Sequence, residues 1–111
     1  MAKKPTKLSL VVSKEARRSI DEIWEWNANQ YGVAQAEAYI DLVWRHVEKL
    51  ESAYLQGTPA NRFRYMIIQR RSRRHGHVLI YEILETSVFV LSVFHTAQDW
   101  HAFIDRLSQA D

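Results

Sequence analysis

The chain has 111 residues, of which 47% are hydrophobic and four are tryptophans, and its formal net charge is +2. This length and composition predict one domain with a single core and favour a folded chain over a disordered one. The absence of cysteine excludes disulfides, thiolate metal sites and a cysteine nucleophile, and it fits a cytoplasmic location. No apolar run reaches the roughly 20 residues that cross a bilayer, so we expect no membrane segment.

Seven elements are predicted by the hydrophobic periodicity, in the order strand, helix, helix, strand, strand, strand, helix. They span residues 7–12, 14–30, 33–55, 63–68, 78–84, 88–95 and 98–107. Residues 1–6 are expected to form a disordered tail, and residues 7–111 a single domain. The predicted fold class is α+β, with a helical hairpin packed on a mainly antiparallel sheet.

The connections between these elements are predicted from residues with special backbone preferences. Ser13 is placed to cap the first helix. Gly32 is expected to end that helix in a left-handed conformation, so that the two helices form an antiparallel hairpin. Residues 56–61, Gln-Gly-Thr-Pro-Ala-Asn, have the composition of a turn.

Positive charge is concentrated in the middle of the chain. No acidic residue lies between Glu51 and Glu82, whereas the interval 14–51 holds eight acidic residues against five Lys or Arg. The acid-free interval contains Arg62, Arg64, Arg70, Arg71, Arg73, Arg74, His75 and His77. The chain is therefore predicted to be acidic in its first half and basic in its middle.

A set of short motifs in a fixed order gives the chain a family resemblance. The motifs are Leu10–Ser13 followed by Glu15-Ala16, Ile20–Trp26, Tyr31-Gly32, Ala36–Tyr39, Arg64, His77–Tyr81 and Val88–His95. In this order they resemble the ParE/RelE toxin superfamily, on its ParE-like side. Two features depart from the family pattern: the stretch after the second helix has unusual spacing, and no tyrosine follows Tyr81.

The resemblance implies the toxin of a type II toxin–antitoxin pair, of the kind found on plasmids, where it serves plasmid stabilization, and on chromosomes. Such a toxin is neutralised by a small cognate antitoxin. ParE-like members are associated with inhibition of DNA gyrase, whereas RelE-like members cleave mRNA on the ribosome. The long helical hairpin favours the ParE-like function. A ribonuclease and an inactive protein-interaction module of the same fold are the alternatives.

The arginine-rich interval is the main candidate for binding the antitoxin or the target. Its members are Arg62, Arg64, Arg70, Arg71, Arg73, Arg74 and His75, and Trp26 joins them as an exposed anchor on the first helix. Arginine forks bind phosphates and carboxylates equally well, and charge alone would also serve to protect a sheet edge. The lack of a nucleic-acid reading motif favours an acidic antitoxin segment. Both a homodimer and a toxin–antitoxin hetero-oligomer fit such a surface.

Candidates for acid–base catalysis are His77, His95, Tyr81 and Arg73, because RNA cleavage needs a base, an acid and a cation on the phosphate. The two histidines lie at predicted strand ends, where they could simply bind the backbone. A binding protein is therefore favoured over an enzyme. No cofactor is expected, and the histidine spacing predicts no metal site.

Overall fold

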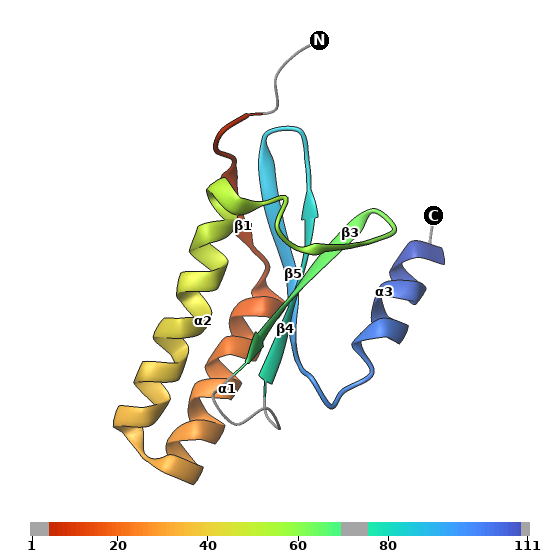
Figure 1. Cartoon of the computed structure of the whole chain (residues 1–111). Helices are drawn as coiled ribbons and strands as arrows, with labels where there is room; N and C mark the ends of the chain where they lie inside the picture. Colours follow the sequence, from red (N-terminus) through yellow and green to blue (C-terminus); the bar gives the residue numbers. More distant parts are fainter. Residues whose placement is uncertain (1–4, 70–75, 110–111) are drawn as a thin grey trace.

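The computed structural model describes residues 5–69 and 76–109, which form three layers (Figure 1). The elements are β1 (Ser9–Val12), α1 (Lys14–Tyr31), α2 (Val33–Ala53), β2 (Thr58–Ala60), β3 (Phe63–Gln69), β4 (Gly76–Ile83), β5 (Ser87–His95) and α3 (Trp100–Gln109). The α1–α2 hairpin covers one face of the sheet, and α3 lies on the other face. The predicted α+β fold with a helical hairpin is confirmed.

The sheet has the strand order β1-β5-β4-β3-β2. β1 pairs with β5 in parallel, and the other three pairings are antiparallel. The predicted β4–β5 hairpin is confirmed, although β4 begins two residues earlier than expected because Gly76 pairs with Gln69. A β-bulge interrupts this hairpin between Ile80 and Tyr81.

The prediction that residues 56–61 form only a turn is wrong. Thr58–Ala60 is a short edge strand, β2, which pairs with the first three residues of β3. Pro59 is tolerated there because an edge strand does not need every amide for the ladder. Asn61 turns the chain with φ of 59°, a left-handed conformation that asparagine adopts more readily than most residues. A three-residue strand is too short to show a hydrophobic period.

The helical hairpin begins and turns at the two residues that the sequence indicated. Ser13 caps α1: its hydroxyl accepts a hydrogen bond from the Ala16 amide at 3.0 Å and donates one to the Leu91 carbonyl at 2.6 Å. Gly32 has the expected positive φ of 95°, but its ψ of 162° lies outside the left-handed helical region. No helix in the described part of the chain has the length and apolar character to span a membrane.

Two apolar clusters hold the layers together. The larger lies between the hairpin and the sheet, with Ile20, Val43, Val47 and Leu50 at its centre. The smaller joins the sheet to α3; its members are Phe63, Val78, Ile80, Trp100 and Ile104. Burial of each such side chain stabilises the fold by about 1.5–3 kcal/mol. The sheet is therefore apolar on both faces.

Alternation along β3 fixes which side chains face which layer. Phe63 and Tyr65 contact the cluster under α3, whereas Met66 and Ile68 contact the cluster under the hairpin. The predicted two-residue period of this strand is thus confirmed. Ile67 shares the face of Phe63 but remains 44% exposed.

A candidate functional site beside Tyr39, His77 and His95

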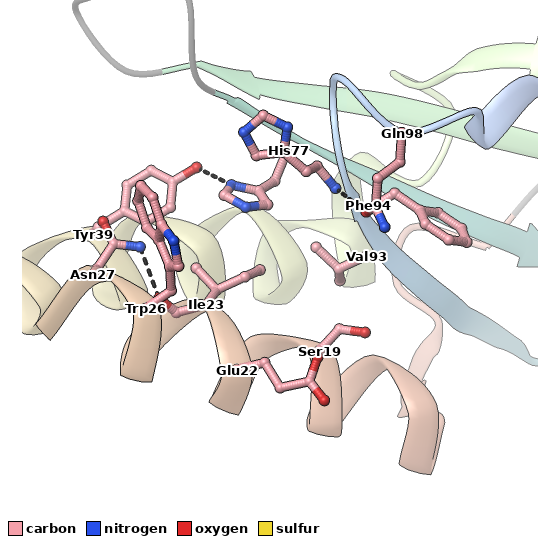
Figure 2. A pocket seen from close by; sticks show the side chains of 11 residues that line it. Ser19, Glu22, Ile23, Trp26, Asn27, Tyr39, His77, Val93, Phe94 and Gln98 are labelled. Carbon is pink, nitrogen blue, oxygen red and sulfur yellow. Dashed lines mark hydrogen bonds between the residues drawn. The ribbon is translucent and has the colours of Figure 1, made fainter. Parts of the chain in front are cut away.

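A pocket of about 340 Å³ lies between α1 and the end of β5 (Figure 2). Its lining comes from both helices of the hairpin and from two neighbouring strands. The lining residues are Ser19, Glu22, Ile23, Trp26, Asn27, Tyr39, His77, Val93, Phe94, His95 and Gln98. The helical hairpin, the sheet and the loop after β5 therefore bring together side chains from distant parts of the sequence.

His77 is the buried centre of this site. It is 9% exposed, and its Nδ1 shares a hydrogen bond of 2.5 Å with the hydroxyl of Tyr39, which is 4% exposed (Figure 2). This bond links α2 to β4 across the core. A hydrogen bond shielded from water is electrostatically stronger than one at the surface, so it fixes the position of both rings.

His95 lies opposite His77 in the β4–β5 ladder. The two imidazole rings meet edge to face, with centroids 5.3 Å apart. His95 is also tied to the loop that follows β5: its Nδ1 accepts a hydrogen bond from the Ala97 amide at 3.0 Å, and its own amide donates to Oε1 of Gln98 at 2.8 Å. Two of the four predicted catalytic candidates therefore lie together.

Tyr81 does not belong to this group. Its buried hydroxyl accepts a hydrogen bond from the Gly57 amide at 2.9 Å and donates one to the Tyr54 carbonyl at 2.8 Å. Burial raises the pKa of Tyr81, against smaller lowering effects of the Gly57 amide and the Arg64 charge. Its hydroxyl thus binds the loop between α2 and β2 to the sheet, which is a structural role.

Arg64 stabilises the same loop from the neighbouring strand. Its Nη1 donates to the carbonyls of Leu55, at 3.0 Å, and Gly57, at 2.7 Å. Together with Tyr81 it satisfies the backbone of the loop that leaves α2. The guanidinium of Arg64 therefore already binds two backbone carbonyls of its own chain.

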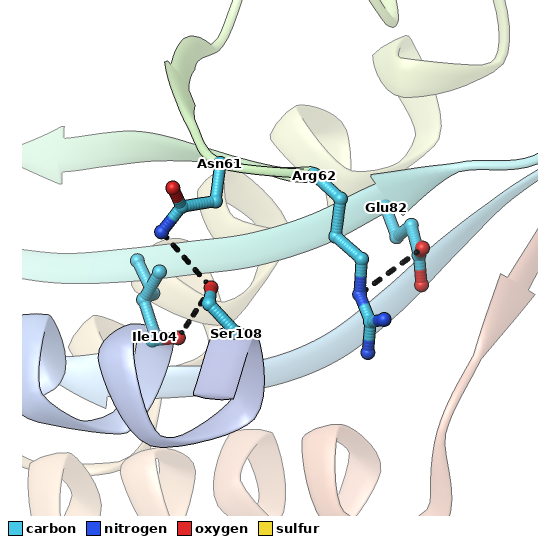
Figure 3. A network of polar contacts seen from close by, with 5 residues as sticks. All are labelled: Asn61, Arg62, Glu82, Ile104 and Ser108. Atoms are coloured by element: carbon cyan, nitrogen blue, oxygen red, sulfur yellow. Dashed lines mark hydrogen bonds and ion pairs between the residues drawn. The ribbon is translucent and has the colours of Figure 1, made fainter. Parts of the chain in front are cut away.

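Arg62 contacts an acidic residue that is distant in sequence. Its Nε lies 3.6 Å from Oε2 of Glu82 (Figure 3). Its guanidinium lies 4.8 Å from the centre of the Phe63 ring. Beside it, Asn61 donates a hydrogen bond to Ser108 of α3. The arginine-rich interval contains no acidic residue of its own, but the fold places Glu82 of β4 beside Arg62.

The other members of the arginine-rich interval lie outside the described residues. They are Arg70, Arg71, Arg73, Arg74 and His75. Arg62 immediately precedes β3 and Arg64 is its second residue, so both lie about 20 Å along the chain from the last residue of the strand. A continuous basic face that joins both groups stays a prediction.

Trp26 is exposed, as predicted, with half of its surface accessible. It lies at the pocket on α1 and packs against Tyr31 edge to face, with ring centroids 5.8 Å apart. An exposed tryptophan beside a pocket is typical of an interface anchor. Its role in binding stays a prediction.

Sequence reasoning missed the contribution of Tyr39 to the site. Tyr39 is buried on α2, whereas its neighbour Ile40 is only partly buried. Tyr39 precedes Val43 and Val47 at four-residue steps, a spacing that could have revealed it. A buried tyrosine hydroxyl usually has a hydrogen-bond partner. A buried Tyr39 would therefore have predicted a polar partner on the sheet, which the structure shows to be His77.

The described residues hold no group of three or more His, Asp or Glu side chains arranged to bind a metal ion. The lining residues offer two imidazoles, a phenol, amides and a carboxylate around an apolar pocket. This chemistry suits the recognition of a partner group.

Comparison with known proteins gives a family and a fold. The family model described as the ParE toxin of type II toxin–antitoxin systems, parDE, matches residues 10–100. Among curated proteins, none matches the sequence at a significant level. A similar solved chain comes from a chromosomal ParDE toxin–antitoxin system of P. aeruginosa, with a TM-score of 0.66 and 15% identity. The alignment covers 81% of this chain and 97% of that one, and at this identity the likeness shows a shared fold.

Proposed function

This chain belongs to the ParE toxin family of type II toxin–antitoxin systems, and from that membership we propose that it inhibits growth by binding a macromolecular target. The observation that carries the proposal is the family match, which extends from the second residue of β1 to the first residue of α3. Its binding partner within the system is an antitoxin.

DNA gyrase is the proposed target, because ParE-like toxins are associated with its inhibition. The placement of the catalytic candidates supports binding over RNA cleavage. The Tyr81 hydroxyl uses both its donor and its acceptor on backbone groups. It also lies four strand positions from His77, about 13 Å along β4. The Tyr81 hydroxyl is therefore too far away to transfer a proton at an RNA phosphate bound beside His77 or His95.

The proposed docking surface for the antitoxin is the arginine-rich interval from Arg62 to His75. An acidic segment of a small protein would complement its charge. A cytoplasmic location and assembly into a toxin–antitoxin hetero-oligomer or a homodimer complete the proposal.

Purified protein is expected to inhibit DNA supercoiling by gyrase and to leave mRNA intact in a translating extract. mRNA should stay intact because Tyr81, a candidate acid, is bonded to the Gly57 amide and the Tyr54 carbonyl, apart from His77 and His95. Gel assays of plasmid topology and of RNA length provide the two measurements. Translation-dependent mRNA cleavage that is lost in His77→Ala or Arg73→Ala would contradict the proposal and favour a ribonuclease. Antitoxin binding without either activity would favour an inactive interaction module.

A further inference from the structure

We propose that the pocket between α1 and the end of β5 binds the target, and not the antitoxin. The ligand we infer is an aliphatic or aromatic side chain on a neutral or basic segment of the target protein. The inference rests on the proposed function, since it requires a target that is a protein. It assigns the target to this pocket and leaves the antitoxin to the arginine-rich interval, which ends two residues before His77.

The shape and lining of the pocket suit one bulky side chain with hydrogen-bonding neighbours. Its volume of about 340 Å³ is at the small end of ligand pockets, which span roughly 300–1,000 Å³. Ile23, Val93 and Phe94 provide apolar walls, and Gln98 brings an amide to the same space (Figure 2). Trp26, half exposed beside it, supplies a rigid aromatic surface for an incoming segment.

Buried polar side chains next to the pocket point independently to a function. Asn27 is 2% exposed within the apolar stripe of α1, where its amide bonds the Ile23 carbonyl at 2.7 Å. Tyr39 and His77 form a second buried polar contact nearby. A buried polar group must keep a hydrogen-bond partner to avoid a cost in free energy, whereas apolar residues would fill such positions without that requirement. Departures of this kind from an apolar core occur mainly at functional or strained sites.

Charge argues against an acidic antitoxin segment as the ligand. Among the described lining residues, Glu22 is the one carboxylate, and none is Lys or Arg. Asp21 and Glu25, both exposed, flank Glu22 on α1. Like charges suppress an interaction, so this rim disfavours an acidic tail and accepts a neutral or basic segment.

Two substitutions at the rim test the assignment without removing core side chains. Trp26→Ala removes the aromatic surface, and Glu22→Lys reverses the charge of the rim. Leu55→Ala, at an exposed apolar residue, and Glu37→Lys, at an exposed acid elsewhere on the hairpin, are the matched controls. The measurements are growth arrest on induction, the concentration that half-inhibits purified gyrase, the Kd for the antitoxin, and Tm.

The two rim variants are expected to lose growth arrest and to need about tenfold or more protein for half-inhibition. Their Kd for the antitoxin and their Tm stay at wild-type values, and both controls behave as wild type. Growth arrest by Trp26→Ala equal to that of wild type would overturn the inference. Weakened antitoxin binding at unchanged Tm would also overturn it, because the antitoxin would then occupy the pocket. A wild-type chain that arrests no growth would instead contradict the proposed function.

Discussion

Replacement of Gly57 by alanine is expected to lower the free energy of unfolding by about 1–3 kcal/mol, the usual cost of overpacking a core. A Cβ atom at this position would lie against the Tyr81 ring, 2.8 Å from its Cε1 and Cζ atoms and in contact with its hydroxyl. The ring cannot retreat easily, because Tyr81 is fully buried and bonded to the Tyr54 carbonyl. The new methyl group would also push apart the Gly57 amide and the Tyr81 hydroxyl that it binds.

Chemical denaturation of four variants tests whether the cost of Gly57→Ala arises at the Tyr81 hydroxyl. Tyr81→Phe removes the hydroxyl, so adding Gly57→Ala to it should cost less than Gly57→Ala costs in wild type. Thr58→Ala, at the exposed neighbouring residue, is the control and should change stability by no more than about 0.5 kcal/mol. Equal costs of Gly57→Ala in both backgrounds would contradict contact with the Tyr81 hydroxyl.

The second large effect is expected for His77→Ala, with a loss of about 2 kcal/mol in the free energy of unfolding. This substitution removes the 2.5 Å hydrogen bond to Tyr39 and leaves a space between α2 and β4. The double variant Tyr39→Phe/His77→Leu should be more stable than His77→Ala. It replaces both partners of the bond by apolar groups that fill the space.

Thermal unfolding of these variants provides the measurement, and His101→Ala, at an exposed histidine of α3, is the control. A His77→Ala variant as stable as the control would show that the Tyr39–His77 bond contributes nothing to the fold. The double variant would contradict the packing argument if it were the less stable of the two.

Local sequence patterns predicted the elements because each pattern acts over a few residues. The four-residue steps of Val43 and Val47 marked α2, and Ser13 marked the start of α1. β2 was missed because three residues carry no period; its pairing depends on the turn at Asn61. Local chemistry therefore predicted the helical hairpin and most of the sheet.

The candidate site was less predictable because it depends on contacts between distant residues. Tyr39 and His77 are 38 positions apart and meet only when α2 packs on the sheet. The Arg62–Glu82 pair likewise follows from the β3–β4 register, which no local pattern specifies. Charge counting found the arginines, but only the fold shows that Arg64 is bonded to a loop of its own chain.

Growth after induction, with and without the cognate antitoxin, tests the central claim most directly. We predict growth arrest when the chain is expressed alone and normal growth when a cognate antitoxin is co-expressed. The antitoxin restores growth because it binds the toxin and withholds it from its target. Equal growth in both cultures, with the folded chain present in each, would contradict a toxin function.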